Sequence, residues 1–407
     1  MPFAITNPIH PVHPVPLRIA MVGPFGFHPN KTMRSRALKL AQALAERGHQ
    51  LHLFMPPWQT PQEAGRHWQE GGVDMTYTGL SGGMVGITGR LIRATLAWRP
   101  DVVHCFKPKA YSGLVAWWLW CFHRSRLRLV TDSDDWEGWG GWNDLAPYTA
   151  LQKRFFAWQE QWGMGHCHTL TVASRALESL AWANGVPPAR VVYLPNGPGI
   201  GGEARGAAAR RAELGLAGRP TILLYSRLFE LDTSRLVEIL RRVQAAVPLM
   251  AFLIVGNSLY EKDAAQFRRQ IEEAGLGEVM VEAGWLAEDL LPATLAAADV
   301  GLYLMDDTLL NRTKCPVKLA DMLNVGLPVV AEAVGQTPEY VVHQHTGLLY
   351  PSGDVEGIAA GLISLLQDTE ARGRLGHGTK SHLEKHFSWE RLAETAERVY
   401  GRPLPPP

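Results

Sequence analysis

The sequence predicts two successive α/β domains, each with a doubly wound parallel sheet, that face each other across a cleft. Along the chain, apolar strands are followed in a repeating order by glycine-bearing turns and amphipathic helices. A glycine- and alanine-rich stretch at 199–209 separates two such series. Since one compact core rarely accommodates 407 residues, we expect two domains of roughly 200 residues each. Buried parallel strands joined by helices are typical of this architecture.

The first series begins with an apolar strand at 17–22, which runs into the turn Gly23-Pro24-Phe25-Gly26. Apolar positions at helical spacing then predict a helix from Met33 to Gly48. Ser174 is a natural N-cap for a later helix that stops at Gly185. Further strands are expected at 51–55, 102–104, 127–130, 170–173 and 191–194, and further helices at about 113–122 and 148–162.

The second series continues the same alternation to the end of the chain. Its strands are expected at 221–225, 252–255, 279–281, 300–304 and 328–331, and a last helix at about 389–400 precedes a proline-rich end. We therefore expect a flexible tail at 1–16, a first domain at 17–197 with a returning C-terminal helix at 388–401, and a second domain at 198–387. In such domains ligands bind at the carboxyl ends of the strands.

Composition excludes several classes of protein. The 40 basic residues balance 39 acidic ones, whereas a nucleic-acid binder usually has a basic surplus. The four cysteines form no CxxC pair, which argues against a disulfide framework and a zinc site and fits a reducing compartment. No run approaches the roughly 20 apolar residues that span a bilayer, and the N-terminus lacks a signal-peptide core. We expect a soluble, cytoplasmic protein without a nucleic-acid partner.

The most informative segment is KCPVKLADMLNVGLPVVA at 314–331. Pro316 suits the first position of a helix, and Lys318 and Asp321 then lie on the same face of it. A helix N-terminus beside Lys314 and Lys318 is a good anion site, and the carboxylate one turn later can accept hydrogen bonds from ribose hydroxyls. The alternative is an ordinary solvated Lys–Asp pair on a surface helix.

This segment belongs to a wider pattern. It comprises VASRALESLAWANGVPPARVVYLPNG (172–197), LYSRLF (224–229), FLIVGN (252–257), KLADMLNVGLPVVA (318–331), GQTPEYVVHQHTGLLYPSGD (335–354) and FSWERLAETAERVY (387–400). In this order and spacing the pattern resembles the family 4 glycosyltransferases of the GT-B fold, and it covers nearly the whole chain past residue 16. The resemblance implies two Rossmann-like domains, the first for the acceptor and the second for a nucleotide-sugar donor.

The resemblance also implies roles for single residues. Asp321 stands where the family has the glutamate that binds the donor ribose, and Arg227 matches its diphosphate arginine. The loop at 284–286 matches the one that reads the nucleobase, and the glycine loop at 23–26 matches the one that approaches the donor phosphates and sugar; a bare strand-to-helix turn is the alternative there. The implied donor site is Gly23, Phe25, Gly26, Arg227, Gly256, Gly284, Trp285, Leu286, Thr313, Lys314, Lys318 and Asp321.

Three positions depart from the family pattern. Thr313 and Asp321 stand where many members have two glutamates eight positions apart. Asp232 stands where the family has a diphosphate lysine, for which Lys314 or Lys318 is the candidate replacement. The histidine that often touches the donor sugar has no counterpart in LRLVTDSDDWEGW at 127–139.

Three carboxylates, Asp132, Asp134 and Asp135, occupy that place at the end of an expected strand. They can hold a sugar hydroxyl or act as the acceptor base. They can also bind a divalent cation, although the resemblance implies catalysis without a metal. Helix capping and solvation of a loop is the third interpretation. Because neighbouring carboxylates repel each other unless something offsets them, we favour function. The candidate catalytic residues are Asp134, Asp135, Arg227 and Lys318.

The first domain is rich in aromatic residues. Trp117, Trp118, Trp120 and Phe122 share one expected helix, which is followed by His123, Arg124, Arg126 and Arg128. One interpretation is a lipid-linked acceptor and peripheral contact with the anionic inner face of a membrane. The other is core packing, which we favour for 117–120. For Trp136, Trp139 and Trp142, set among glycines, we expect stacking on the acceptor.

The resemblance implies transfer of a sugar from a UDP- or GDP-linked donor to a hydroxyl acceptor, with retention of configuration and without a metal or a further cofactor. A nucleotide-sugar epimerase of the same fold and a non-catalytic partner subunit are the alternatives. A dinucleotide oxidoreductase is disfavoured, because no GxGxxG follows a strand. His104, His166 and His168 lack partners at metal-ligand spacing and are interpreted as structural.

Overall fold

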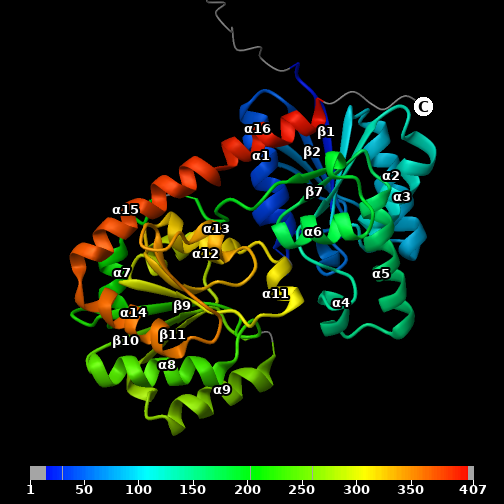
Figure 1. Cartoon of the computed structure of the whole chain (residues 1–407). Helices are drawn as coiled ribbons and strands as arrows, with labels where there is room; N and C mark the ends of the chain where they lie inside the picture. Colours follow the sequence, from blue (N-terminus) through cyan, green and yellow to red (C-terminus); the bar gives the residue numbers. More distant parts are fainter. Residues whose placement is uncertain (1–14, 30, 202, 259, 402–407) are drawn as a thin grey trace, which may run out of the picture.

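The computed structural model describes residues 15–29, 31–201, 203–258 and 260–401. The chain forms two lobes, each built on its own sheet, and helices α15 and α16 run along the outside from the second lobe to the first (Figure 1). The prediction of two doubly wound α/β domains is confirmed. The tail predicted at 1–16 lies outside the described residues up to residue 14.

The first sheet has eight strands in the order β3-β4-β2-β1-β5-β6-β7-β8. All neighbours are parallel except the β3–β4 pair. The strands are β1 (Arg18–Val22), β2 (Gln50–Met55), β3 (His67–Glu70), β4 (Val73–Tyr77), β5 (Val102–Phe106), β6 (Arg128–Ser133), β7 (Thr169–Val172) and β8 (Val191–Tyr193).

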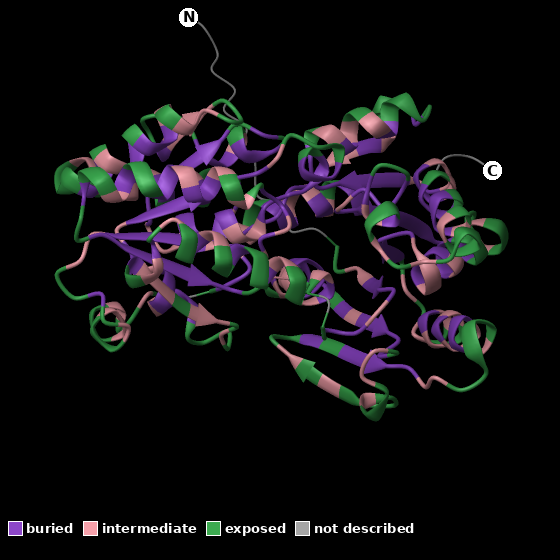
Figure 2. Cartoon of the chain, turned by 90° about the horizontal axis from the view of Figure 1, so that it is seen from below, coloured by how far each residue is buried: buried purple, intermediate pink, exposed green. Residues whose placement is uncertain are grey.

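Helices cover both faces of this sheet, so its central strands β5, β6 and β7 are buried along their whole length (Figure 2). A π-helical turn (Met33–Leu38) leads into α1, and α1 lies with the returning α16 on one face. On the other face lie α2, α3 and α6, together with the end of α5. The helices are α1 (Lys39–Glu46), α2 (Gly83–Ala97), α3 (Ala110–His123), α4 (Trp142–Leu145), α5 (Ala150–Gly165) and α6 (Arg175–Ala183).

The second sheet has six parallel strands in the order β11-β10-β9-β12-β13-β14. The strands are β9 (Thr221–Tyr225), β10 (Ala251–Val255), β11 (Met280–Gly284), β12 (Val300–Tyr303), β13 (Val329–Glu332) and β14 (Gly347–Tyr350). The helices are α7 (Ala207–Glu213), α8 (Thr233–Ala246), α9 (Glu261–Glu273), α10 (Leu291–Leu295), α11 (Leu309–Thr313), α12 (Val317–Asn324), α13 (Thr337–Tyr340), α14 (Val355–Gln367), α15 (Thr369–His386) and α16 (Trp389–Tyr400).

The last helix, α16, packs on the first domain although it follows the second in sequence. Leu392, Ala396 and Val399 belong to the same core as Ile19 of β1. The Tyr400 hydroxyl lies 2.9 Å from Nδ1 of the buried His104. The apolar face of α16 therefore completes the core of the first domain.

Three strands, β3, β4 and β14, were not predicted from the sequence. Strand β3 reads HWQE and pairs only with β4 at the sheet edge, so it lacks the apolar run of a central strand. Strand β14 reads GLLY and is also an edge strand. Their pairing, rather than their composition, makes them strands.

The two domains touch through buried hydrogen bonds. Ser174, which also caps α6 as predicted, donates its hydroxyl to the Thr313 carbonyl at 2.7 Å. The Tyr340 hydroxyl donates to the Asn196 carbonyl at 2.6 Å. These contacts fix the carboxyl ends of the two sheets toward the same interdomain region.

Each sheet has one place where the strand order reverses direction. In the first sheet this point lies between β1 and β5, and in the second between β9 and β12. Ligands of open α/β sheets bind in the crevice at such a point, because the loops that follow the two strands diverge there.

Candidate active site

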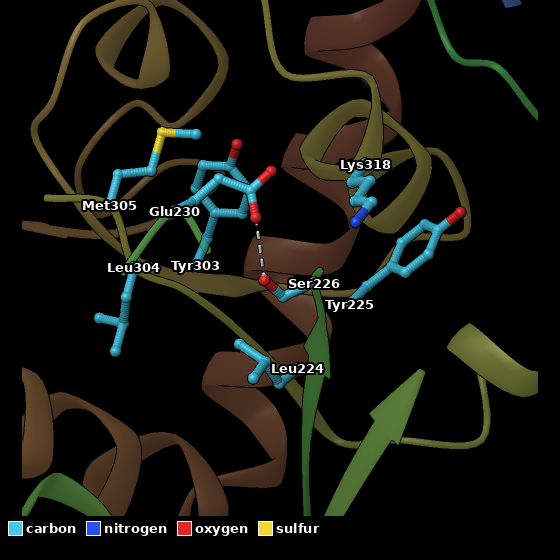
Figure 3. Close-up of a pocket in the computed structure, with 8 residues that line it drawn as sticks. All are labelled: Leu224, Tyr225, Ser226, Glu230, Tyr303, Leu304, Met305 and Lys318. Atoms are coloured by element: carbon cyan, nitrogen blue, oxygen red, sulfur yellow. Dashed lines mark hydrogen bonds between the residues drawn. The ribbon is translucent and has the colours of Figure 1, made fainter. Parts of the chain in front are cut away.

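A small pocket lies at the point where the order of the second sheet reverses (Figure 3). Its volume is about 20 Å³. Residues after β9 and β12 form most of its wall, and α12 supplies one charged side chain. The lining residues are Leu224, Tyr225, Ser226, Glu230, Tyr303, Leu304, Met305 and Lys318.

That charged side chain is Lys318, in the first turn of α12. The helix begins at Val317, so Pro316 is its N-cap and not its first residue as predicted. The Lys318 ammonium points between the Tyr225 ring and Glu230, and its Nζ is buried without a hydrogen-bond partner in the described part of the chain (Figure 3). Burial lowers the pKa of Lys318 to about 7. The Nζ lies 5.1 Å from the centre of the Tyr225 ring, but a buried ammonium without a hydrogen bond is an incomplete interaction that an anionic ligand would complete.

Two further basic side chains, Lys314 and Arg227, lie beside the Glu230 carboxylate. Glu230 Oε1 lies 3.5 Å from Lys314 Nζ and 3.6 Å from Arg227 Nη2. Burial disfavours the charged carboxylate, but Lys314, Lys318 and Arg227 hold the pKa of Glu230 below its usual range. One carboxylate therefore faces three basic side chains, and we call these four residues the cation cluster. Its excess positive charge fits a ligand with more than one negative charge.

Aromatic rings cover this cluster from across the cleft. Trp142, in α4 of the first domain, has its ring centroid 5.4 Å from that of Phe229 in the second domain. Lys314 Nζ lies 4.1 Å from the Phe229 ring and 5.3 Å from the Trp142 ring. Trp142 was predicted to stack on the acceptor; the structure places it beside the cations of the donor side.

Asp321 lies on α12 but is tied to the chain that links the domains. Its Oδ1 accepts hydrogen bonds from the Gly199 amide at 2.7 Å and the Ile200 amide at 3.1 Å. Burial raises the pKa of Asp321 to about 7, against the effect of these two amides. One carboxylate oxygen is therefore occupied by the linker, and a contact with ribose stays a prediction.

Thr313 is not placed to bind a donor. It is fully buried, its hydroxyl donates to the Leu310 carbonyl, and its carbonyl accepts from Ser174. These bonds join α11 to the first domain, which corrects the expected ligand contact. Asp232, at the position of the missing lysine, caps α8 by accepting from the Ser234 amide.

The predicted glycines have packing reasons for their size. Gly256 has φ of +100°, and a Cβ there would collide with the Ser226 carbonyl oxygen. A Cβ on Gly23 would collide with the Met33 side chain, and one on Gly26 would press on the Tyr77 ring. These contacts favour a bare strand-to-helix turn at 23–26, while Phe25 packs partly on the core of the first domain.

The loop predicted to read the nucleobase follows β11. Gly284 has φ of +64°, Leu286 packs on the core of the second domain, and Trp285 is 61% exposed. Two residues later, Glu288 accepts from Arg34 of the first domain at 3.0 Å. This loop therefore lies beside the first domain, with an exposed indole ring.

A second charged cluster lies in the first domain, after β5 and β6. Lys107 Nζ lies 3.1 Å from Asp134 Oδ1, 3.0 Å from Asp135 Oδ2 and 3.0 Å from Glu137 Oε1. Lys109 adds a contact of 2.5 Å to Glu137. We call these five residues the carboxylate cluster. The ammonium of Lys107 is what offsets the repulsion between neighbouring carboxylates that the sequence left unexplained.

Burial and Lys107 set the protonation of this cluster. Burial raises the pKa of Asp134 to about 6, against the opposing charge of Lys107. Burial also disfavours the Lys107 ammonium, but Asp134, Asp135 and Glu137 raise its pKa well above the usual value. Asp135 is the most exposed of the three carboxylates, with 22% of its side chain accessible. It is the one best placed to meet an acceptor hydroxyl.

Asp132 is a structural residue, contrary to its predicted place on the acceptor side. It is fully buried, and its oxygens accept from Arg36 Nε at 2.8 Å and Nη2 at 2.7 Å. Burial would raise the pKa of Asp132, but Arg36 lowers it. A bidentate ion pair inside the domain leaves no room for a ligand.

The predicted aromatic residues differ from one another in exposure. Trp136 is buried, and its Nε1 donates to the carbonyl of Trp139, whose own ring is 50% exposed. Only Trp139 is therefore free to stack on an acceptor. Trp117 and Trp118 are 36% and 38% exposed, so the packing interpretation of this helix is wrong for both.

Sequence reasoning missed Lys107, Lys109, Arg36 and Glu230, which balance the predicted charges. Lys107 and Lys109 follow β5 in the segment FKPK, and the carboxylates follow the neighbouring strand β6. Basic residues that follow one strand and acidic residues that follow its neighbour were the sequence signal from which this pairing could have been predicted. The interpretation of His104 as structural is confirmed by its bonds to Tyr400 and Thr171 inside the core.

Comparison with known protein families matches both domains. Residues 31–197 match the family described as Glycosyl transferase 4-like domain, and residues 219–368 match the family described as Glycosyl transferases group 1. The 2-deoxystreptamine N-acetyl-D-glucosaminyltransferase of Streptomyces fradiae is 26% identical over 345 residues, 75% of this chain and 76% of that protein.

A mannosyltransferase is more similar over a shorter length. The GDP-mannose-dependent alpha-(1-6)-phosphatidylinositol monomannoside mannosyltransferase of Mycobacterium tuberculosis is 30% identical over 221 residues, 51% of this chain and 54% of that protein. The chain thus spans about half the length of the curated mannosyltransferases that it matches. The structure of HepE from Anabaena in complex with UDP and glucose superposes with a TM-score of 0.70 at 17% identity, covering 95% of this chain and 100% of that one.

Proposed function

We propose that this chain, which belongs to the family 4 glycosyltransferases of the GT-B fold, transfers a sugar from a nucleoside diphosphate sugar to a hydroxyl acceptor. The donor diphosphate binds at the cation cluster, and the acceptor hydroxyl lies near the carboxylate cluster. The single observation that carries the proposal is the Lys318 ammonium, buried at a pocket without a hydrogen-bond partner in the described residues.

The cation cluster supplies the electrostatic part of the reaction. As the bond from sugar to phosphate breaks, negative charge grows on the leaving diphosphate, and Arg227, Lys314 and Lys318 stabilise it. Charges fixed before the reaction lower the barrier without reorganisation, and removing one such donor typically costs about 10²–10³ in rate. We propose transfer with retention of configuration, in which the leaving diphosphate takes up the acceptor proton.

The carboxylate cluster holds the acceptor in place. Asp135 accepts a hydrogen bond from an acceptor hydroxyl while Lys107 fixes the orientation of its carboxylate at 3.0 Å. The neighbouring Asp134 is almost fully buried and acts with Lys107 as a support. We propose a lipid-linked acceptor, because the mannosyltransferase relative is named for a phosphatidylinositol monomannoside. We propose a UDP- or GDP-linked donor, because the HepE structure contains UDP and the mannosyltransferase is named as GDP-mannose-dependent.

Binding of the donor tests the first half of this proposal. Nucleoside diphosphates and nucleotide sugars with each base are added in turn while thermal unfolding is followed, since a ligand of the folded state raises the melting temperature. We expect a rise with one uridine or guanosine diphosphate series, and loss of that rise in Lys318→Met. Unchanged melting with every nucleotide would contradict the proposal.

Measurement of turnover tests the proposed role of the carboxylate cluster in holding the acceptor. We expect Asp135→Asn to lower kcat/KM for the acceptor by about 10- to 100-fold, the range for loss of a hydrogen bond to a charged group. Binding of the nucleotide sugar in this variant should not weaken, because Asp135 acts on Lys314 across the domains and removing its negative charge does not oppose an anion there. The matched control is Asp144→Asn, an aspartate of the same segment whose side chain accepts from the Gly140 amide. Wild-type kcat/KM in Asp135→Asn would remove this carboxylate from the reaction.

A further inference from the structure

One layer of helices in the first domain has an outer face that the transferase site does not use. Helices α2, α3 and α5 pack side by side, and their inner faces lie on the same side of the first sheet. Leu91, Leu119 and Met164, one from each helix, are fully buried there. The opposite side of the layer is turned to solvent, and we call it the α2–α3–α5 face.

Large apolar side chains lie exposed on this face. Phe122 is 58% exposed, and its ring centroid lies 4.4 Å from that of Trp118 on the same helix. On α5, Trp158 is 43% exposed and stacks on Phe155 at 5.8 Å. The exposed large apolar residues of the three helices are Met84, Val85, Trp117, Trp118, Phe122, Leu151 and Trp158. Exposed large apolar side chains gathered on neighbouring helices in this way are typical of an interaction site.

Charge on the face has one sign. In the sequences of α2, α3 and α5 the only carboxylate is Glu160, which is fully buried. Arg93, Arg154 and, just after α3, Arg124 and Arg126 are exposed. The whole chain has 40 basic and 39 acidic residues, so the carboxylates are concentrated elsewhere.

The outer helices of the second domain show the ordinary arrangement. On α8, Glu238 pairs with Arg241 at 3.2 Å and with Arg242 at 2.9 Å, and on α9 Arg268 pairs with Glu282 at 3.1 Å. Arg241, Arg242 and Arg268 therefore each have an acidic partner on the protein. The α2–α3–α5 face has bases and aromatic rings without such partners on its own helices.

We propose that the α2–α3–α5 face binds an anionic lipid bilayer. Aromatic rings prefer the depth of the headgroups, and arginines beside them meet lipid phosphates. A second copy of the chain is a poorer occupant, because two faces of the same positive sign repel each other. In the described part of the chain no helix is long and apolar enough to cross a membrane, so the contact is peripheral.

The face lies next to the acceptor side of the cleft. Helices α3 and α5 begin at Ala110 and Ala150, close to the ends of β5 and β6 where the carboxylate cluster lies. Lys109 of that cluster has its Nζ 5.1 Å from the ring of Phe156, a buried residue of α5, so the cluster contacts the inner side of this helix layer. A bilayer on this face would therefore present a lipid-linked acceptor to the cleft. This consequence rests on the proposed function, whereas the binding itself does not.

Co-sedimentation with vesicles tests the proposal without any turnover. The full chain is mixed with vesicles of phosphatidylcholine alone or with added phosphatidylglycerol. We expect binding to the phosphatidylglycerol vesicles that falls as salt is raised. Arg124→Glu and Arg154→Glu should each weaken it by well over the roughly fivefold expected per unit charge near an anionic surface, since each removes one positive charge and adds a negative one.

One double variant and two control variants separate the apolar and charged contributions to vesicle binding. Trp118→Ser with Phe122→Ser should lower binding to the same vesicles, and the matched control Leu249→Ser, an exposed apolar residue of the second domain, should not. Arg269→Glu, exposed on α9, is the control for charge. Nucleotide-induced thermal shifts in every variant report an intact second domain, so a failure of membrane binding is distinguished from a failure of the proposed transferase function.

Three outcomes would overturn the proposal. The first is no sedimentation with phosphatidylglycerol vesicles. The second is equal binding by wild type, Arg124→Glu and Arg154→Glu. The third is a wild-type dimer that Trp118→Ser with Phe122→Ser converts to a monomer, which would show that a second copy covers the face.

Discussion

The cation cluster and the carboxylate cluster belong to different domains and lie close enough for the charge of Asp135 to act on Lys314, but they differ in how many of their charges are paired. In the carboxylate cluster, one ammonium contacts three carboxylates at 3.0–3.1 Å, and a second lysine contacts one of them. In the cation cluster, three basic side chains share one carboxylate at 3.5 Å or more, and Lys318 has no hydrogen-bond partner in the described residues.

This difference indicates that the two domains have different roles, one in positioning a neutral group and the other in binding an anion. A cluster in which every carboxylate contacts an ammonium is held rigidly and can position a neutral group such as a sugar hydroxyl. A cluster with excess buried charge is costly until an anion arrives, so it is suited to bind one. The first domain is therefore prepared before binding, whereas the second is completed by its ligand.

Removing the shared ammonium of the carboxylate cluster should have the largest effect. Lys107→Met leaves Asp134, Asp135 and Glu137 buried together without their common partner. Breaking a buried charge network in this way costs about 3–5 kcal/mol of unfolding free energy. Denaturant unfolding measures it, with the exposed Lys262→Met as the matched control. A loss below about 1 kcal/mol would mean that the carboxylates take up protons at little cost and that the cluster is not rigid.

Removing the Lys318 ammonium should raise the free energy of unfolding of the ligand-free protein and lower its affinity for the nucleotide sugar. Lys318→Met deletes a buried ammonium without a hydrogen bond, so we expect the ligand-free protein to become more stable. The same variant loses a charged contact to the diphosphate, worth about 1.5–3 kcal/mol or roughly 10- to 100-fold in affinity. Unfolding of the free protein and calorimetric titration with the nucleotide sugar measure the two effects. Destabilisation of the free protein would show that Lys318 has a structural partner.

The smallest expected effect is a pH dependence of donor binding. Lys318 has its pKa lowered to about 7, so the free protein loses this proton as pH rises through 7. Since the diphosphate binds the charged form, affinity for a nucleotide sugar should fall about tenfold per pH unit above that point. Lys318→Arg stays charged and should give a flat profile. A flat profile in the wild type would place the diphosphate away from Lys318.

Several features followed from the sequence alone because they depend on neighbours along the chain. Apolar runs set most of the strands, and Ser174 at the start of α6 and Gly326 after α12 set helix ends. The order of motifs was sufficient for the family. Arg227, Lys314 and Lys318 were also singled out from the sequence, and the structure gathers them around one carboxylate, that of Glu230.

Only the tertiary structure decided which acidic side chain pairs with which basic side chain. Asp132 and Asp135 are three residues apart, yet Arg36 takes the first into the core and Lys107 holds the second at the cleft. Trp117 and Trp118 face outward, and Trp142 meets a ring from the other domain. The sequence determined the elements because backbone preference and apolar period are local. The balance of charge and exposure is a sum over residues that are distant in the chain, and only packing brings them together.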